Sequence, residues 1–115
     1  MFELDYPDVV STKHLLINDI VNAKDFVKSG RYNLIGINLC IDPSSIMSSL
    51  INQGFDCNIP TLVYSECVLV YLNKKTSENL IELLVSNISS IIWMTYDMVY
   101  YIYTIEIFFK DQSIR

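Results

Sequence analysis

Short apolar runs alternate with amphipathic segments along the chain, and this alternation predicts strands and helices in turn. Strands are expected at residues 2–6, 32–39 and 91–96, and another begins at Thr61 in an apolar run that reaches Leu72. Helices are expected at residues 9–21, 43–53 and 77–88, with residues 22–31 as a connector. The repeated order of strand and helix argues for an α/β fold with a mostly parallel sheet and right-handed crossovers.

Turn and capping residues mark where these elements begin and end. Pro7 disfavours helix at the residue before it and ends the first strand. Asp42 is expected to cap the second helix, Pro43 suits its first position, and Gly54 stands where a left-handed stop belongs. Thr76 is expected to cap the third helix.

The length, composition and charge of the chain limit its domain count and the kinds of partner that it can bind. With 115 residues and 51% apolar content, it has the length and the material of about one domain with a core. Its 13 acidic and 8 basic residues give a net charge of -5, so there is no electrostatic reason to expect nucleic acid or an acidic membrane surface as a partner. Residues 88–109 are apolar, but Asp97 near their middle and their β-branched and aromatic content favour strands over a transmembrane helix.

The cysteines, the histidine and the glycines argue against several kinds of site. Cys40, Cys57 and Cys67 form no C-x-x-C pair, a pattern that suits reduced thiols in the cytoplasm, and scattered thiols with one histidine predict no metal site. His14 has no partner at a diagnostic spacing and is expected on a helix surface. The three glycines lie 6 and 18 residues apart, which excludes the G-x-G-x-x-G and P-loop motifs.

Polar residues stand at or near the ends of all four expected strands. They are Asp5, Asn38, Glu66 and Asp97. Ligands of open parallel sheets bind outside the carboxyl ends of the strands, so these are the candidate site residues. A single polar side chain at a strand end is commonly just solvated, but four on one edge favour a ligand site.

Three of these residues suggest a specific chemistry. Glu66 interrupts an apolar run, where a carboxylate is costly to bury, so we expect it to face a cavity or a cation, unless it accepts backbone N–H groups at a helix start. Asp5 suits hydrogen bonds from ribose hydroxyls, and Asn38 offers a donor and an acceptor to an adenine edge. The catalytic residues remain unknown, and Trp93 is better explained by strand packing than by base stacking.

Three segments of the sequence resemble the leucine carboxyl methyltransferases. They are Phe-Glu-Leu-Asp-Tyr-Pro-Asp-Val-Val at residues 2–10, Arg-Tyr-Asn-Leu-Ile-Gly-Ile-Asn-Leu at 31–39, and Pro-Thr-Leu-Val-Tyr-Ser-Glu-Cys-Val-Leu-Val-Tyr at 60–71. The resemblance runs from residue 2 to about residue 96, and Ser-Glu-Cys-Val-Leu-Val-Tyr is its most specific part. It implies an incomplete class I methyltransferase fold, which is Rossmann-like, and S-adenosylmethionine as the methyl donor.

The resemblance also implies a substrate and a reaction. The substrate is the C-terminal leucine carboxylate of the protein phosphatase 2A catalytic subunit, and a related branch methylates carboxyl groups on the wybutosine base of transfer RNA. A carboxylate oxygen attacks the sulfonium methyl in line, and no general base is needed because a carboxyl with a pKa of about 3.5 is ionised at neutral pH. The alternative is a non-catalytic or degenerate module that binds the phosphatase without methylating it.

Site residues carry over from the family by matched position. Asp5 resembles the residue that holds the cofactor ribose, and Glu66 matches a glutamate near the methionine end of the cofactor. Asn38 stands where the family usually has Asp against the adenine amine, and Leu39 offers a backbone contact beside it. Cys40 replaces a usual Arg. The Asn38 amide still accepts a hydrogen bond but lacks the charge, so the resemblance implies weaker adenine binding.

Two departures from the family pattern set the expected domain limits. The family begins before the position of Phe2, with a strand and a glycine-rich loop, so residues 1–99 are expected to form a partial methyltransferase domain. The absent strand would lie between the first and third strands of this chain, leaving unpaired edges and exposed apolar surface that favour association. Residues 100–115 form a divergent C-terminal tail, whose aromatic run can add an edge strand and is also typical of aggregating segments.

Overall fold

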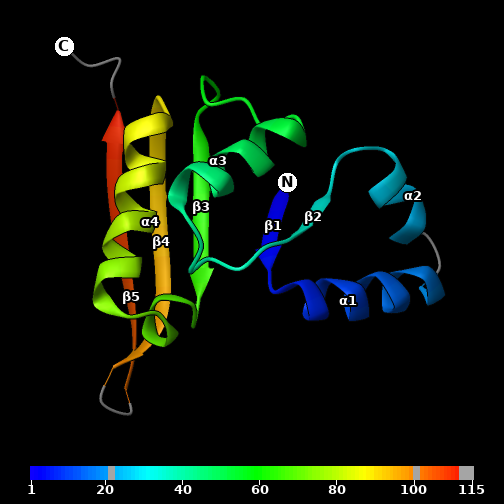
Figure 1. The fold of residues 1–115 in the computed structure, drawn as a ribbon, viewed down its shortest axis with the longest axis horizontal. Coiled ribbons are helices and arrows are strands. Elements are labelled where there is room, and N and C mark those ends of the chain that lie inside the picture. The colour runs from blue at the N-terminus through cyan, green and yellow to red at the C-terminus, as the bar shows by residue number, and fades with distance from the viewer. Residues whose placement is uncertain (21–22, 100–101, 112–115) are drawn as a thin grey trace. The chain divides into compact units, whose positions relative to one another are not determined.

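A computed structural model describes residues 1–20, 23–99 and 102–111 of the chain (Figure 1). The chain divides into two compact units, Met1–Phe55 and Asp56–Arg115. Each unit combines a small sheet with helices, so the expected α/β class is confirmed at the level of the elements and their order. The strands form two sheets, one of two strands and one of three, and among the described residues no strand pairing joins them into one sheet.

The first unit contains two parallel strands and three helices. They are β1 (Phe2–Asp5), α1 (Pro7–Asp19), α2 (Ala23–Lys28), β2 (Asn33–Gly36) and α3 (Pro43–Asn52). The strands are in register from Phe2 opposite Asn33 to Asp5 opposite Gly36. Their carboxyl ends therefore lie at the same edge, as the sequence predicts for a parallel pair. The buried apolar side chains of this unit are Val10, Ile35, Ile37, Ile46, Met47 and Leu50.

The structure corrects three expectations for the first unit. Residues 22–31 are not a plain connector, because α2 occupies Ala23–Lys28. The first helix begins at Pro7, two residues earlier than expected, because proline suits the first helical turn as well as it ends a strand. The second strand ends at Gly36, three residues before the expected limit. The expected helical residue Val21 lies outside the described residues.

The α3 helix follows the predicted limits but not the predicted cap. Asp42 occupies the N-cap position, but its side chain accepts no backbone N–H there, and its carboxylate instead accepts from the Ser44 hydroxyl. Pro43 begins the helix, and Gly54 adopts a φ of 88°, the left-handed conformation expected after a helix end. The predicted helix stop at Gly54 is confirmed.

A close backbone approach explains the glycine at the end of β2. A Cβ atom added to Gly36 would lie 3.1 Å from Cα of Pro7 and 3.5 Å from Cβ of Val10. The first turn of α1 therefore lies directly against the end of β2. This contact fixes the turn from β1 into α1, and with it the position of Asp5.

The second unit contains three strands and two helices. They are β3 (Thr61–Glu66), the 3₁₀ helix η1 (Leu69–Tyr71), α4 (Lys74–Asn87), β4 (Ser90–Val99) and β5 (Ile102–Asp111). The β3 and β4 strands are parallel, and β5 is antiparallel to β4. The expected edge strand in the tail is therefore confirmed, and the apolar run expected from Thr61 to Leu72 splits into β3 and η1. Both β1 and β3 have a single strand neighbour among the described residues, which leaves the unpaired edges that the resemblance implies.

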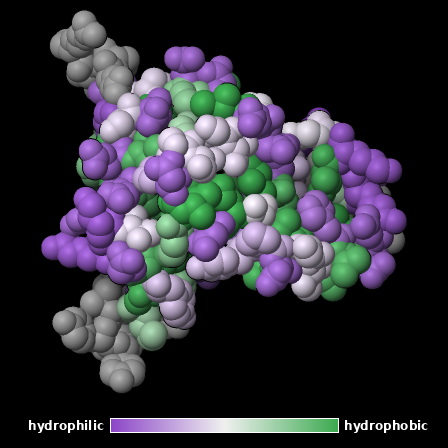
Figure 2. Space-filling view, viewed as in Figure 1, coloured by the Kyte–Doolittle hydropathy of each residue, from purple (hydrophilic) through white to green (hydrophobic). Residues whose placement is uncertain are grey.

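The start of α4 differs from the predicted one. Asn73, not Thr76, is the N-cap residue, and its side-chain oxygen accepts the backbone N–H of Thr76 at 2.9 Å. Lys74 and Lys75 follow in the first turn, where positive charge opposes the helix dipole. Because lysines are unfavourable at a helix start, the sequence predicts a later start than the observed one. Figure 2 shows that the side chains over α4 are mostly hydrophilic on the side that faces the viewer.

The core of the second unit lies between α4 and one face of its sheet. Leu80, Leu84, Ile88, Ile91 and Trp93 are buried there. The Trp93 indole N–H donates to the buried Ser65 hydroxyl at 3.1 Å, which confirms that Trp93 serves strand packing. Residues 90–99 and 102–111 form strands, as expected for the apolar segment. Within the described residues, no helix has the length and apolar character needed to cross a membrane.

Candidate functional site

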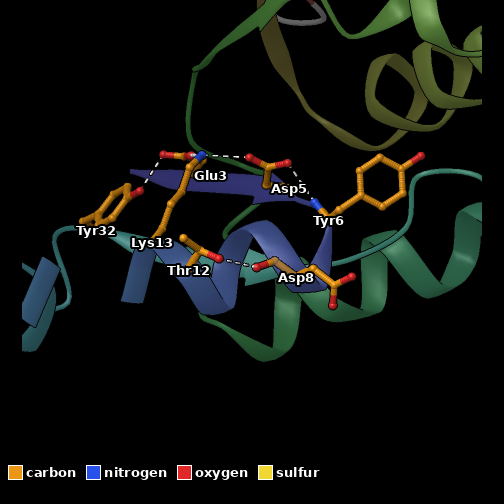
Figure 3. A network of polar contacts seen from close by, with 7 residues as sticks. All are labelled: Glu3, Asp5, Tyr6, Asp8, Thr12, Lys13 and Tyr32. Carbon is orange, nitrogen blue, oxygen red and sulfur yellow. Dashed lines mark hydrogen bonds and ion pairs between the residues drawn. The ribbon is translucent and has the colours of Figure 1, made fainter. Parts of the chain in front are cut away.

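Asp5 ends β1 and is held by two donors (Figure 3). Its Oδ1 accepts the backbone N–H of Tyr6 at 2.8 Å, and its Oδ2 accepts from Lys13 Nζ at 2.7 Å. The first bond comes from the turn into α1, and the second comes from the helix itself. Both oxygens of Asp5 are therefore oriented before any ligand is present.

Glu3 lies two residues earlier on the same face of β1 and joins the same network. Lys13 Nζ also donates to Glu3 Oε1, so one ammonium group bridges two carboxylates. The Tyr32 hydroxyl donates to Glu3 Oε2 at 2.5 Å. The network links β1, α1 and the residue that precedes β2, and Figure 3 shows its members converging on one side of β1.

The network shifts the pKa values of Glu3, Asp5 and Lys13 toward their charged forms. Burial opposes ionisation of Glu3, but the hydrogen bonds from Lys13 and Tyr32 outweigh it and lower the pKa of this carboxyl. Burial likewise opposes ionisation of Asp5, and the bonds from Lys13 and the Tyr6 backbone lower its pKa. The bonds to Asp5 and Glu3 raise the pKa of Lys13. Asp5 is therefore ionised at neutral pH and can only accept hydrogen bonds.

Burial and the bond to Glu3 raise the pKa of Tyr32 to about 12. Its hydroxyl therefore keeps its proton and remains a donor to Glu3 throughout the physiological range.

Sequence reasoning missed Lys13, although it completes the site. Lys13 lies 8 residues from Asp5 and 10 from Glu3, and no short motif joins residues so far apart. The signal that was available is the i, i+2 spacing of Glu3 and Asp5, which places two carboxylates on one strand face and calls for a nearby cation. Lys13 of α1 therefore positions the carboxylates of the candidate site.

Asn38 and Leu39 follow β2 at the edge where Asp5 ends β1. Asp5 pairs with Gly36 in register, two residues before Asn38, which confirms that Asp5 and Asn38 share one edge. Asn38 is exposed, and its Oδ1 accepts the backbone N–H of Cys40 at 2.9 Å. Among the described residues, neither the Asn38 side-chain nitrogen nor the Leu39 backbone N–H makes a hydrogen bond. Both groups are available to a ligand.

The remaining hydrogen-bonding capacity of this edge fits a nucleoside. An ionised carboxylate has about four acceptor positions, and Asp5 uses two of them on Tyr6 and Lys13. The other two match the two hydroxyls of a ribose. Asn38 retains both N–H donors and one acceptor position, which suits the edge of an adenine. The residues of the first unit therefore fit the cofactor that the resemblance implies.

Glu66 does not behave as the sequence predicts. It is the last residue of β3, it is exposed, and its carboxylate accepts from the Tyr64 hydroxyl at 3.5 Å. The strand alternation turns this side chain away from the buried Ser65, and the expectation that Glu66 faces a cavity or a cation stays a prediction. The helix-start alternative is wrong, since Glu66 ends β3 and η1 begins only at Leu69. Burial and the nearby Glu66 carboxylate raise the pKa of Tyr64.

Asp97 lies inside β4 instead of following a strand. It pairs with Thr104 of β5, whose backbone continues the ladder past the expected end at Tyr96. The Thr95 hydroxyl donates to Asp97 Oδ2 at 2.6 Å, and Oδ1 is buried without a hydrogen bond from any described residue. Glu66 pairs with Tyr96, so Glu66 and Asp97 lie at the same end of the β3–β4 pair.

The remaining candidate side chains have simple roles. His14 is exposed on α1, which confirms its expected place on a helix surface. All three cysteines are free, with Cys40 exposed and Cys57 and Cys67 half-buried. Cys67 has a φ of 50°, which is uncommon for a residue other than glycine, and its N–H donates to the Tyr96 carbonyl at 2.8 Å. This bond fixes the backbone just after Glu66.

Comparisons with known proteins support the resemblance. The family model described as leucine carboxyl methyltransferase matches residues 1–85. Leucine carboxyl methyltransferase 1 of Debaryomyces hansenii is 32% identical over 102 residues, which cover 70% of this chain and 28% of the relative. A probable leucine carboxyl methyltransferase 1 of Caenorhabditis briggsae is 36% identical over 78 residues, with 68% of this chain and 23% of the relative covered.

The corresponding protein of Rattus norvegicus is 28% identical over 114 residues, which cover 85% of this chain and 34% of the relative. The chain therefore spans between about a quarter and a third of the length of these curated relatives.

Proposed function

Because this chain belongs to the leucine carboxyl methyltransferase family, we propose that it forms part of an S-adenosylmethionine-dependent methyltransferase that acts on a C-terminal leucine carboxylate. The match of the family model to residues 1–85 is the observation that carries the proposal. The family implies a methyl donor of this type, which supplies a methyl group on a positively charged sulfur. The proposed substrate is the C-terminal tail of the protein phosphatase 2A catalytic subunit.

In this proposal the first unit holds the nucleoside part of the cofactor. Asp5 accepts the two ribose hydroxyls with the acceptor positions that Lys13 and Tyr6 leave open. Asn38 contacts the adenine edge, and Leu39 offers its backbone N–H beside it. Lys13 acts as a positioning residue, because it holds the Asp5 carboxylate in one orientation and keeps it ionised.

Glu66 is proposed to contact the methionine end of the cofactor. Its exposed carboxylate at the end of β3 is open to an ammonium group, and the Tyr64 hydroxyl orients it from the same strand. The substrate carboxylate is ionised at neutral pH, so the chain needs no general base to prepare it. The three free thiols suit a reducing compartment, and we place the protein in the cytoplasm on that ground.

Methyl transfer to a peptide tests the proposal directly. Because the resemblance places a strand and a glycine-rich loop before Phe2, the assay uses this chain and a fusion protein in which the preceding segment of the Debaryomyces hansenii relative is joined before Met1. The substrates are the leucine-ended phosphatase tail and the same peptide with a C-terminal amide.

We expect the fusion protein to methylate the free carboxylate and not the amide. Binding of S-adenosylmethionine without methylation of either peptide would reject the proposed substrate, and methylation of transfer RNA instead would assign the protein to the wybutosine branch.

A non-catalytic phosphatase-binding module is the second candidate. By the resemblance, Asn38 and Cys40 stand where the family usually has charged residues, and both are exposed, so part of the cofactor chemistry is altered. Retention of the phosphatase catalytic subunit by this chain, with no methylation by the fusion protein, would favour this candidate. If resin that carries this chain retains no more phosphatase subunit than resin without protein, the second candidate is rejected.

A further inference from the structure

Glu3 and Tyr32 belong to the network around Asp5, but neither lies at the edge that the cofactor nucleoside is proposed to occupy (Figure 3). Glu3 precedes Asp5 by two residues on β1, which places it about 6–7 Å farther from the carboxyl edge. Tyr32 precedes β2 and lies at the opposite, amino end of the strand pair. Both oxygens of Glu3 are already engaged, one by Lys13 and the other by Tyr32. Glu3 is therefore placed to act on its neighbours and not on a ligand.

One ammonium group serves two carboxylates in this network. Lys13 Nζ lies 2.7 Å from Asp5 Oδ2 and also donates to Glu3 Oε1. Between 29% and 36% of each of these side chains is exposed, so water screens the charges only in part. Because Glu3 takes a share of the ammonium charge, the Asp5 carboxylate is incompletely neutralised and remains a strong acceptor. Because Glu3 also holds the ammonium group from the other side, Lys13 is restrained at one oxygen of Asp5.

Tyr32 fixes the orientation of the Glu3 carboxylate. Its hydroxyl donates to Glu3 Oε2 at 2.5 Å, which leaves Oε1 directed toward Lys13. The pKa of Tyr32, raised to about 12, keeps this hydroxyl a donor at neutral pH. The hydrogen bonds therefore run without a break from Tyr32 through Glu3 and Lys13 to Asp5, and in such a chain each bond strengthens the next.

We propose that Tyr32 and Glu3 are positioning residues for the cofactor ribose, and that they act through Lys13 on the Asp5 carboxylate. This inference rests on the proposed function, in which Asp5 accepts the ribose hydroxyls. Removal of the Tyr32 hydroxyl frees the Glu3 carboxylate to rotate, and removal of the Glu3 charge leaves the Lys13 ammonium to Asp5 alone. In both cases Asp5 loses part of the orientation or of the accepting strength that the ribose hydroxyls use.

Calorimetric titration of S-adenosylmethionine into the fusion protein tests this role with the changes Tyr32→Phe and Glu3→Gln. Each change is made both with Lys13 present and in a Lys13→Met background, so that its dependence on the ammonium group is measured. Tyr71→Phe and Glu82→Gln, at exposed positions of the second unit, are the matched controls. Urea unfolding establishes that each variant is folded under the conditions of the titration.

With Lys13 present, we expect Tyr32→Phe to raise the dissociation constant by about threefold and Glu3→Gln by about fivefold. In the Lys13→Met background, each change is expected to alter it by less than about 1.5-fold, because the connection to Asp5 is already lost. Tyr32→Phe removes no charge, so its effect separates positioning from the long-range attraction between Glu3 and a positively charged cofactor. If Glu3→Gln does not fold, Tyr32→Phe, which keeps the aromatic ring, decides the question.

Three results would overturn the inference. If Tyr32→Phe and Glu3→Gln change the affinity no more than the controls do, the two residues do not position the ribose, and the proposed function still stands. If their losses are the same with and without Lys13, they do not act through its ammonium group. If the unmodified fusion protein binds no S-adenosylmethionine, the proposed function is rejected and this inference with it.

Discussion

Lys13 Nζ lies 2.7 Å from Asp5 Oδ2 and also donates to Glu3, so a single ammonium group holds two carboxylates of one strand face. Without Lys13, the negative charges of Glu3 and Asp5 would face each other without compensation. Lys13→Met is expected to lower the free energy of unfolding by about 1 kcal/mol, a value kept small because the lysine is partly exposed. It is also expected to raise the pKa of Asp5, measured by NMR titration of its carboxyl carbon. Lys24→Met, which removes an exposed lysine from α2, is the control, and equal effects of the two changes would contradict the role of Lys13.

The same network predicts how stability varies with pH. The pKa values of Glu3 and Asp5 are lowered on folding, so the unfolded chain binds more protons near pH 4, and the free energy of unfolding falls as pH drops from about 5 to about 3. The pKa values of Lys13 and Tyr32 are raised, so their contribution is present below about pH 10 and is lost as pH rises toward about 12.

Urea unfolding of the chain over this pH range measures both effects. We expect Lys13→Met to flatten the dependence at its acid end, and Tyr32→Phe to flatten it at its alkaline end. If the free energies of unfolding of Lys13→Met and Tyr32→Phe vary with pH as that of Lys24→Met does at both the acid and the alkaline end, the network does not couple folding to protonation.

The contact between Gly36 and Pro7 gives a packing prediction. A methyl group at Gly36 would meet the Pro7 backbone at 3.1 Å, closer than ordinary contact, and backbone moves less readily than a side chain. Gly36→Ala is therefore expected to destabilise the chain by about 1–2 kcal/mol in urea unfolding. Ser48→Ala, at an exposed position of α3, is expected to change stability by less than about 0.5 kcal/mol. A Gly36→Ala variant as stable as the unmodified chain would mean that α1 does not lie against β2.

The amide at position 38 gives a prediction about binding. The Asn38 oxygen is neutral and already accepts from the Cys40 backbone, whereas a carboxylate there would form a stronger, charge-assisted bond to an adenine amine. Asn38→Asp is expected to tighten binding of S-adenosylmethionine to the fusion protein by about threefold to tenfold in calorimetry. Asn58→Asp, an exposed amide of the second unit that follows α3, is the control. Weaker binding by Asn38→Asp would remove this residue from the proposed adenine contact.

Local signals in the sequence predicted the elements whose limits depend on the backbone itself. Pro7 fixes its φ, whereas Gly54 permits a positive φ that other residues rarely adopt, so the end of β1 and the stop after α3 were predictable. By contrast, α2 has only six residues, too few to show a helical period. The extension of β4 to Val99 depends on hydrogen bonds with β5. The sequence of β4 alone does not predict that pairing.

The candidate site was predictable only in part for the same reason. Asp5 and Asn38 share an edge because parallel strands align their carboxyl ends, a rule that sequence order supplies. Lys13 reaches Asp5 only after α1 has folded back beside β1, so its role depends on tertiary structure. Glu66 was expected to face a cavity or a cation because its neighbours in the sequence are apolar, but several of those neighbours, including Leu62 and Tyr64, are themselves exposed.

Calorimetric titration of S-adenosylmethionine into the fusion protein tests the central claim, that the edge formed by Asp5 and Asn38 holds the cofactor nucleoside. Asp5→Ala is compared with Asp8→Ala, which removes an exposed carboxylate three residues away. We expect saturable binding that Asp5→Ala weakens by about tenfold or more and that Asp8→Ala leaves within about twofold. Absence of binding by the folded fusion protein, or equal affinities of the two variants, would contradict the claim.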